Sequence, residues 1–252
     1  LNVTLWEKNG RKLHLSAAGE YLLKAAQRLE PQYKEIERSL IAYGKGKRGM
    51  LRIGVECHPC YDFLLLPIQS FLAKWNDVDV EVTRNFRFDG YTALRDHHVD
   101  VLISPDYLEY SGLEYHPVLD FELMLAVAPE HWLASRSFVS PADLQNEILF
   151  TYPIERERLD VFVNFLLPAG STVREHIPVE NTEIMLQLVA SGRGVSTFPD
   201  WIIQKHAAHY SVKGIQLGET GIHKHLYFVV RSDTAKGDYL DDFISMAYET
   251  SV

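Results

Sequence analysis

The chain has 252 residues, 46% of them hydrophobic and 23% charged, with a formal net charge of -9 at pH 7. This composition is that of a folded protein with one large or two medium domains, and it excludes disordered and collagen-like classes. Two cysteines exclude a disulfide scaffold and favour a reducing cytoplasm as the location. The longest apolar stretches, 63–68 and 123–128, fall far short of the roughly 20 residues that span a bilayer, so we expect no membrane partner.

Positive charge gathers at the N-terminal end. Residues 1–48 carry ten Lys and Arg against five Asp and Glu, whereas residues 49–252 carry fifteen against twenty-nine. This asymmetry indicates an end that faces polyanions and a body that does not. The chain begins with Leu and has no signal-peptide pattern, which favours a piece of a longer protein.

The first 15 residues predict a β-hairpin. Residues 1–6 and 12–15 alternate between apolar and polar side chains, and Asn9-Gly10 between them is a strong turn signal. The tip is polar and basic, with Lys8, Asn9, Arg11 and Lys12.

Residues 17–43 predict one long helix, with Ser16 as its N-cap. Apolar residues recur along it in alternating steps of four and three, the spacing of a coiled-coil seam: Leu22, Ala26, Leu29, Tyr33, Ile36, Leu40 and Tyr43. A second copy of the same helix is the simplest partner, so we expect a homodimer; a lone amphipathic helix packed on its own domain is the alternative. Pro31 predicts a kink near Glu30, at a position that points outward from the seam.

From residue 49 the pattern changes to strands that alternate with helices. The expected strands are 51–56, 78–83, 99–103, 121–128, 147–151, 195–198 and 225–231; the expected helices are 61–75, 90–97, 156–167, 181–192, 199–209 and 236–250. Strands separated by helices predict an α/β fold with parallel sheets. The long, largely apolar strands 121–128 and 225–231 suit two sheet subdomains that two strands cross. Glycines at 44, 46 and 49 match G-x-G-x-x-G, but they follow a helix and precede a strand, so we reject a dinucleotide site.

Both cysteines lie in one short stretch, Cys57-His58-Pro59-Cys60, after the first expected strand of the body. This spacing fits a dithiol redox centre, half of a zinc site, or one wall of a pocket. A zinc site would need ligands from elsewhere, and the other histidines of the chain are scattered. In open α/β sheets ligands bind at the carboxyl ends of the strands, which places this stretch at a ligand site.

Several stretches resemble LysR-type transcriptional regulators. The N-terminal one is Leu5-Trp-Glu-Lys-Asn-Gly-Arg-Lys-Leu-His-Leu-Ser-Ala-Ala-Gly19, which is similar to the wing and the start of the linker helix in that family. Within the body, the stretches Arg52–Cys60, Leu119–Leu123, Tyr152–Asp160, Pro168–Gly170 and Val179–Thr182 resemble the members that regulate methionine biosynthesis, and Val127–His131 is similar to a stretch of the wider family.

The resemblance implies an α/β, two-subdomain effector domain like that of periplasmic binding proteins, preceded by a winged-helix remnant and a long coiled-coil linker helix. Residues 1–15 would be the wing of a truncated winged helix-turn-helix, 16–48 the dimerisation helix and hinge, and 49–252 the effector domain. Subdomain I would comprise about 49–123 and 229–252, and subdomain II about 124–228. A solute-binding protein would share the cleft but would not need the basic hairpin or the seam.

The same resemblance implies a regulator without catalytic activity or cofactor, sensing homocysteine or a related small amino acid. It implies promoter DNA and a homodimer or tetramer as partners, with RNA polymerase as a further one, and Lys8, Asn9, Arg11 and Lys12 as DNA contacts. A different small effector, or a thiol-redox role of Cys57 and Cys60, is the alternative.

The expected effector-binding residues gather where the strand ends would meet. They are Cys57, His58, Cys60, Phe86, Phe88, Ser104, Tyr152, Asn181, Thr182, Thr197 and Phe198. Asn181 and Thr182 would meet the effector carboxylate at a helix N-terminus, a position that also suits plain N-capping. Asp89, Asp106, Ser104 or Tyr152 would accept from its ammonium. Arg156 and Arg158, which stand among acidic residues, are expected to form solvent-facing ion pairs outside the site.

Overall fold

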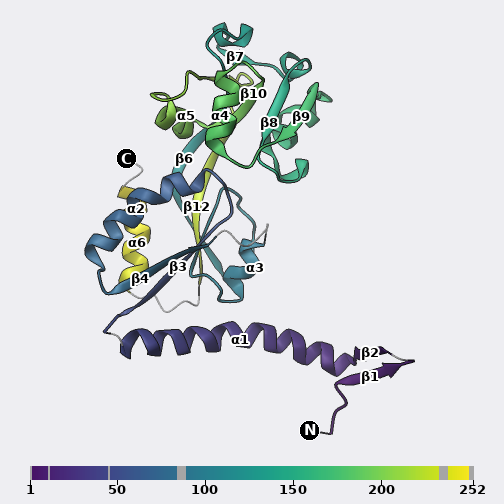
Figure 1. The fold of residues 1–252 in the computed structure, drawn as a ribbon, viewed down its shortest axis with the longest axis vertical. Coiled ribbons are helices and arrows are strands. Elements are labelled where there is room, and N and C mark those ends of the chain that lie inside the picture. Colours follow the sequence, from purple (N-terminus) through teal and green to yellow (C-terminus); the bar gives the residue numbers. More distant parts are fainter. Residues whose placement is uncertain (1, 11, 45, 84–88, 233–237, 250–252) are drawn as a thin grey trace.

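The computed structural model describes residues 2–10, 12–44, 46–83, 89–232 and 238–249. It shows a hairpin, one long helix and a body of two lobes (Figure 1). Among the described residues, no helix is both long and apolar enough to cross a membrane.

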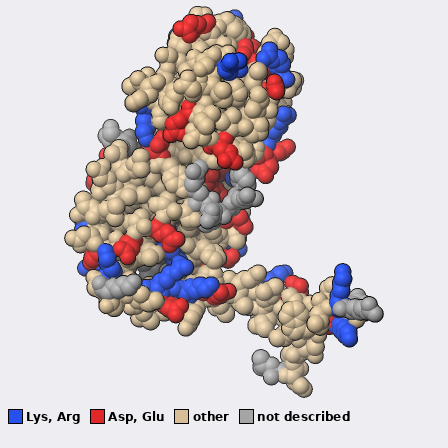
Figure 2. All heavy atoms as spheres, in the orientation of Figure 1, with Lys and Arg blue, Asp and Glu red and all other residues tan. Residues whose placement is uncertain are grey.

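The N-terminal hairpin consists of β1 (Trp6–Asn9) and β2 (Lys12–Leu15), paired antiparallel with Trp6 opposite Leu15. The expectation of a first strand at 1–6 was wrong, because the tight turn lets only the four residues directly before it pair with β2. Gly10 has a φ of 63°, a conformation that glycine adopts without strain. Lys8 and Lys12 are exposed, and Figure 2 shows positive charge at this end of the molecule. Arg11 and the side chain of Asn9 lie outside the described residues.

Helix α1 runs from Ala17 to Gly44, with Pro31 inside it. The Ser16 hydroxyl accepts from the backbone N–H of Gly19 at 3.1 Å, as an N-cap does, and donates to the Thr4 carbonyl at 2.6 Å. Gly19 is required here, because a Cβ on it would lie 2.1 Å from the Leu5 carbonyl oxygen.

Helix α1 has two different faces. The larger seam side chains are all exposed, from 49% for Leu22 to 67% for Tyr33, and Ala26 is exposed too. Pro31 is buried and lies in a groove with Arg52 and His97 of the body. Pro31 was expected to point outward from the seam. It does lie on the opposite face of the helix, but the body of the same chain covers it.

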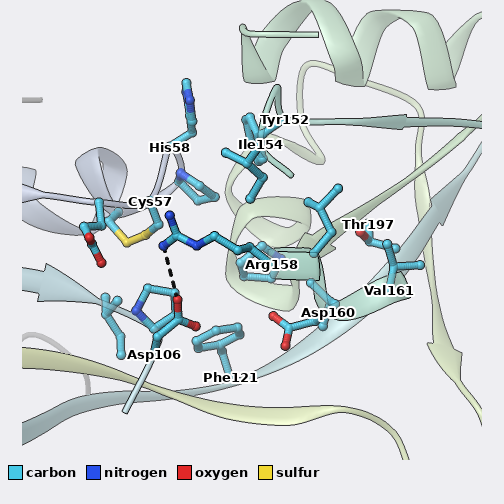
Figure 3. Close-up of a pocket in the computed structure, with 18 of the residues that line it drawn as sticks. Cys57, His58, Asp106, Phe121, Tyr152, Ile154, Arg158, Asp160, Val161 and Thr197 are labelled. Atoms are coloured by element: carbon cyan, nitrogen blue, oxygen red, sulfur yellow. Dashed lines mark ion pairs between the residues drawn. A yellow bond between two sulfur atoms is a disulfide. The ribbon is translucent and has the colours of Figure 1, made fainter. Parts of the chain in front are cut away.

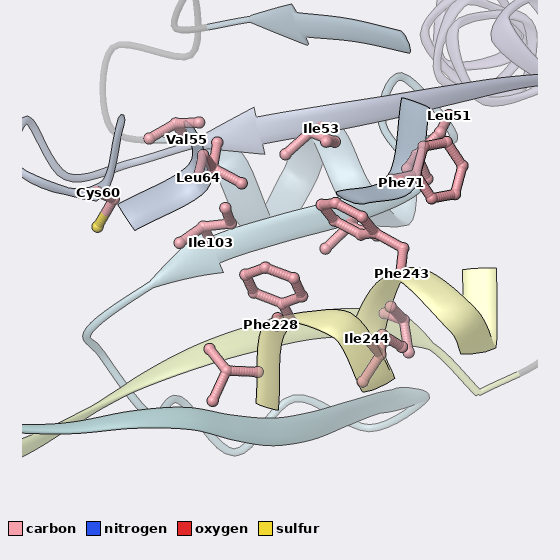
Figure 4. Close-up of a cluster of buried hydrophobic side chains, with 14 of the residues drawn as sticks. Leu51, Ile53, Val55, Cys60, Leu64, Phe71, Ile103, Phe228, Phe243 and Ile244 are labelled. Atoms are coloured by element: carbon pink, nitrogen blue, oxygen red, sulfur yellow. The ribbon is translucent and has the colours of Figure 1, made fainter. Parts of the chain in front are cut away.

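Lobe I is a sheet in the order β4-β3-β5-β12-β6, covered by helices. Its elements are β3 (Gly49–Val55), α2 (Cys60–Lys74), β4 (Val78–Thr83), α3 (Gly90–Arg95), β5 (Val101–Ser104) and α6 (Asp238–Glu249). The first three strands of that order are parallel, as expected for strands joined by helices. Helices α2 and α6 cover one face, where Phe71, Phe228 and Phe243 are fully buried (Figure 4).

Two long strands, β6 (Leu113–Val127) and β12 (His223–Arg231), run between the lobes (Figure 1). They pair antiparallel, with a register shift between Leu226 and Tyr227. Such irregularities bend a strand locally. The side chains of Leu226 and Phe228 already belong to the lobe I core, so the second crossing lies a few residues before the expected boundary at 228/229.

Lobe II is built on the second half of β6. Its strands are β7 (Phe138–Val139), β8 (Ile148–Thr151), β9 (Glu175–Pro178), β10 (Val195–Pro199) and β11 (Lys213–Leu217), and its α-helices are α4 (Thr182–Ala190) and α5 (Asp200–His206). β10 and β11 flank β6, and β8 and β9 extend the sheet beyond β10. Short 3-10 turns cover 132–135 and 141–144.

Three of these strands, β7, β9 and β11, were not expected from the sequence. β7 has only two residues, too few to show a pattern, and β9 and β11 carry Pro and Gly respectively, which weaken the local strand signal. The expected helix 156–167 is broken into a 3-10 turn at 156–158, a π-helical stretch at Val161–Leu166 and a second 3-10 turn at 167–169. Leu159 interrupts it, because an extended backbone there (φ -89°, ψ 112°) turns the side chain into the lobe II core.

Candidate ligand-binding site

A cavity of about 140 Å³ lies between the lobes (Figure 3). Lobe I contributes Glu56, Cys57, His58, Pro59, Cys60, Pro105 and Asp106; the crossing strands contribute Phe121, Leu123 and Leu226; and lobe II contributes Tyr152, Ile154, Arg158, Leu159, Asp160, Val161, Thr197, Pro199 and Trp201. The strand ends of both lobes therefore meet here, as the rule for open α/β sheets predicts.

Cys57 and Cys60 are joined by a disulfide on the lobe I wall. Their Cα atoms are 5.3 Å apart, within the range that a disulfide bridges, and the stretch forms one wall of a pocket, one of the three interpretations of its sequence. Cys60 is the first residue of α2 and is only 1% exposed, whereas Cys57 is partly exposed. The described residues hold no group of three His, Cys, Asp or Glu side chains that could bind a metal ion.

The loop between the cysteines reaches across to lobe II. The imidazole of His58 stacks on the ring of Tyr152, with ring centres 4.6 Å apart and planes within 10° of parallel. The Tyr152 hydroxyl is hydrogen-bonded to the Thr182 hydroxyl at 2.8 Å. The side chain of Asn181 caps α4 by accepting from the N–H of Ile184 at 2.8 Å. A series of contacts thus connects the disulfide loop of lobe I, through Tyr152, to the N-terminus of α4 in lobe II.

Charged side chains from both lobes meet at one end of the cavity. The Arg158 guanidinium extends from lobe II to 3.7 Å from the Asp106 carboxylate of lobe I (Figure 3). The Lys224 ammonium, on β12, donates to Asp106 at 3.2 Å and to Asp160 at 2.7 Å. Burial lowers the pKa of Lys224, but the two carboxylates outweigh burial and leave the pKa above its ordinary value.

Glu56 is the remaining carboxyl of the cavity wall. It accepts from the Gly90 N–H at 3.1 Å and from the Ser104 hydroxyl at 3.0 Å. Burial raises the pKa of Glu56, and these two hydrogen bonds only partly oppose that effect. Glu56, Asp106 and Arg158 also line a second, wider cavity of about 850 Å³, so they form a partition between the two.

Trp201 lies at the junction of the lobes. Its side chain packs against the core of lobe I and against the α4/α5 core of lobe II, and it lines the cavity. The indole Nε1–H is buried and has no hydrogen-bond partner among the described residues. A buried donor without a partner costs about 1–3 kcal/mol, so an acceptor in the cavity that received this hydrogen bond would be favoured.

A second contact joins the lobes beside the cavity. Asp62, in the first turn of α2, accepts from Lys205 at 2.8 Å and lies 3.2 Å from the ring nitrogen of His206, both on α5. Burial raises the pKa of Asp62, but the hydrogen bonds from Lys205 and His206 outweigh it and lower the pKa below its ordinary value. We call Asp62, Lys205 and His206 the interlobe clamp.

The structure brings only part of the expected effector site to the cavity. Cys57, His58, Cys60, Tyr152 and Thr197 line it. Ser104 and Phe198 are fully buried and do not line it, and Asn181 and Thr182 lie behind Tyr152. Phe86 and Phe88 lie outside the described residues.

Sequence reasoning missed most of the apolar wall and four polar or aromatic side chains on it, Glu56, Arg158, Asp160 and Trp201. Arg158 forms an ion pair and is exposed, as expected, but its partner is Asp106 of lobe I and it lines the cavity, so its exclusion from the site was wrong. No local signal identified Arg158, because the carboxylate that it meets, Asp106, belongs to the other lobe.

Two lobes joined by two crossing strands, with a largely apolar cavity that carries charged groups at one end between them, define a bilobed ligand-binding domain. The LysR substrate binding domain family matches residues 44–251, and the chain belongs to this family. The HTH-type transcriptional regulator MetR of Salmonella typhimurium is 35% identical over 244 residues, which are 97% of this chain and 75% of the relative.

Two solved structures are also similar. The regulatory domain of NMB2055 (MetR) from N. meningitidis superimposes with a TM-score of 0.73 at 29% identity, covering 80% of this chain and 93% of that one. A further structure of that domain carries serine in place of two cysteines three positions apart. Full-length CbnR complexed with its target DNA shares the fold, with a TM-score of 0.66 at 20% identity, over 94% of this chain and 82% of that one. The chain is thus a transcriptional regulator, not an enzyme.

Proposed function

We propose that this protein regulates methionine biosynthesis by sensing homocysteine in the cavity between its lobes. The observation that carries the proposal is the lining of that cavity: one guanidinium from Arg158, three carboxyl groups from Glu56, Asp106 and Asp160, and an otherwise largely apolar wall. The likeness to regulators named MetR supports the methionine assignment.

The size of the cavity supports a small effector. A volume of about 140 Å³ is close to that of engineered protein cavities, of about 150 Å³, that bind benzene. Homocysteine has a comparable number of non-hydrogen atoms. A peptide or a nucleotide would not fit without opening the lobes.

The charges support an amino acid. Arg158 offers a planar donor pair to an α-carboxylate. Asp106 and Asp160, held in place by Lys224, offer acceptors to an α-ammonium. The two methylenes and the sulfur would then lie along Phe121 and Leu226 of the crossing strands. Each lobe supplies part of this set, so binding would favour the closed arrangement.

The N-terminal elements support promoter DNA and a second copy of the chain as partners. The hairpin would be the wing, and Lys8 and Lys12 would contact phosphate groups of the DNA backbone. The exposed seam of α1 would pair with the same seam of another protomer. Such a regulator would act in the cytoplasm, where promoter DNA is.

Thermal unfolding in the presence of amino acids tests the effector. Homocysteine at about 100 times its Kd should raise the free energy of unfolding by about 2.7 kcal/mol. Methionine, cysteine and homoserine, which differ in the end group or the chain length, should stabilise less at equal concentration. No shift with millimolar homocysteine would exclude it as the effector, and a larger shift with another of these compounds would name a different one.

A further inference from the structure

We infer that the cleft captures its effector covalently, by thiol–disulfide exchange between a small amino-acid thiol and the Cys57–Cys60 disulfide. The inference rests on the proposed function and specifies how the same site binds. This bond joins the two cysteines of the chain, and both line the cavity. In a reducing compartment disulfides are mostly transient, with catalytic or regulatory roles.

The two sulfurs are not equivalent. Cys57 follows β3 and is partly exposed, whereas Cys60 is 1% exposed and begins the 15-residue helix α2. An incoming thiolate therefore has access to the sulfur of Cys57. The sulfur of Cys60 would leave as a thiolate at a helix N-terminus, which stabilises negative charge and makes it the better leaving group.

The exchange needs no further reactant. The effector thiol loses its proton to solvent, and its thiolate attacks Cys57 Sγ. A sulfur–sulfur bond forms between the effector and Cys57 while the bond between Cys57 and Cys60 breaks, and its electron pair leaves with Cys60 Sγ. Attack by the Cys60 thiolate on the new bond reverses the step and releases the effector. Capture is thus reversible, with no net change in the number of disulfides.

The rest of the cavity provides selectivity among thiols. The guanidinium of Arg158 and the carboxylates of Asp106 and Asp160 stand on the same cavity as the disulfide (Figure 3). An amino acid held by these groups would present its side-chain thiol to the wall, which raises the effective concentration of the nucleophile. A thiol without the amino and carboxylate groups would lack that advantage.

Breaking the disulfide would affect the contacts of this loop with lobe II. His58, which stacks on Tyr152, lies between the two cysteines, and Asp62 of the interlobe clamp lies two residues after Cys60. When the bond breaks, the covalent ring that holds His58 opens. The chemical state of the disulfide is thereby connected to two of the contacts that join the lobes, the His58–Tyr152 stack and the interlobe clamp.

Mass spectrometry of the full chain after alkylation tests the inference. Protein is incubated with homocysteine without other reductant, quenched with N-ethylmaleimide, and digested. We expect one homocysteine on Cys57 and one maleimide on Cys60 of the same molecules. At equal thiolate concentration, 2-mercaptoethanol should give this species about tenfold less, because it lacks the groups that hold an amino acid.

Two cysteine variants distinguish the sulfurs. With homocystine, the disulfide form of the amino acid, Cys60→Ser should be modified about tenfold faster than Cys57→Ser, because Cys57 is partly exposed whereas Cys60 is only 1% exposed. Circular dichroism of both variants shows whether they are folded. Equal rates in two folded variants would overturn the assignment of Cys57 as the attacked sulfur. If the variants are unfolded, the digest of wild-type protein tests the assignment, because it shows which cysteine carries homocysteine.

Three outcomes separate this inference from the proposed function. Thermal stabilisation by homocysteine without any adduct would overturn covalent capture and leave homocysteine as a non-covalent effector. Two maleimides and no homocysteine would mean simple reduction, which also overturns it. Neither stabilisation nor adduct would overturn the proposed function together with the inference.

Discussion

Arg158 illustrates how one side chain in the site escaped prediction. In the sequence it stands between Glu157 and Leu159 in a strongly charged run, which favours a surface ion pair. In the structure its partner, Asp106, comes from the opposite lobe, 52 positions away in the chain. Local sequence holds no information about that approach. The C-x-x-C stretch was easier to predict, because both reactive groups and the strand before them are contiguous.

Replacing Arg158 with Gln should weaken effector binding by about tenfold to a hundredfold, because a hydrogen-bonded ion pair to a carboxylate contributes about 1.5–3 kcal/mol. Isothermal titration with homocysteine measures the change. Arg156→Gln is the matched control, since Arg156 lies over the Phe162 ring and does not line the cavity. Equal losses in the two variants would contradict the role of Arg158.

Glu56 should make stability depend on pH in an identifiable way. Because burial raises its pKa in the folded state, the folded protein binds the proton more tightly than the unfolded chain, whose Glu pKa is about 4.3. The stabilisation is complete below that value and is lost as the pH rises through the folded-state pKa. Urea unfolding across this range should show that wild type loses stability relative to Glu56→Gln.

The control for this measurement is Glu130→Gln, at an exposed carboxyl in a turn. Its difference from wild type should stay constant over the same range. If the Glu56→Gln difference is constant as well, Glu56 does not titrate as its burial implies.

Among the elements, α1 shows what periodicity predicts and what it does not. The seam spacing indicated a long helix with one continuous apolar stripe, and the helix from Ala17 to Gly44 carries that stripe exposed. The opposite face, with Pro31, gave no apolar signal, because it meets the body through a polar groove. Periodicity reports apolar faces, so β7, β9 and β11, which are short, escaped it too.

The double variant Leu29→Asp with Ile36→Asp should be monomeric in sedimentation velocity experiments at concentrations where wild type is dimeric. Two buried carboxylates without partners in the seam would oppose association. Lys24→Asp with Arg28→Asp is the control, because these exposed residues lie off the seam and the change adds even more negative charge. A dimer that persists in the seam variant would place the interface elsewhere.

At the scale of the whole molecule, the two lobes are joined by β6 and β12 and touch through His58–Tyr152, Arg158–Asp106 and the interlobe clamp. The two crossing strands were predicted in part, because 121–128 and 225–231 are largely apolar runs with strand character. The first half of β6 was not expected, since Glu114, Pro117 and Asp120 interrupt its apolar pattern. The contacts between lobes were not predictable, since they depend on how two separately folded sheets face each other.

Asp62→Asn should lower the affinity for homocysteine by about two- to fivefold, although Asp62 does not line the cavity. The reason is that the variant weakens the clamp, and the effector then has to close a looser pair of lobes. Calorimetric titration together with the radius of gyration from X-ray scattering checks this. Asp242→Asn, whose partners Lys74 and Trp75 are in lobe I, should bind normally. An unchanged affinity in Asp62→Asn would show that the clamp does not contribute to binding.

The strand order of lobe I also constrains how the chain is made. β12 lies between β5 and β6, yet about 100 residues of lobe II separate it from β6 in the chain. During translation, the sheet of lobe I therefore keeps a central gap until the ribosome has released residue 231. The edges of β5 and β6 stay open for that time, and open edges invite pairing with other chains. Lobe II, complete by then, is the part of the body that can fold first on the ribosome, and nascent chains stopped before β12 would be the ones to aggregate.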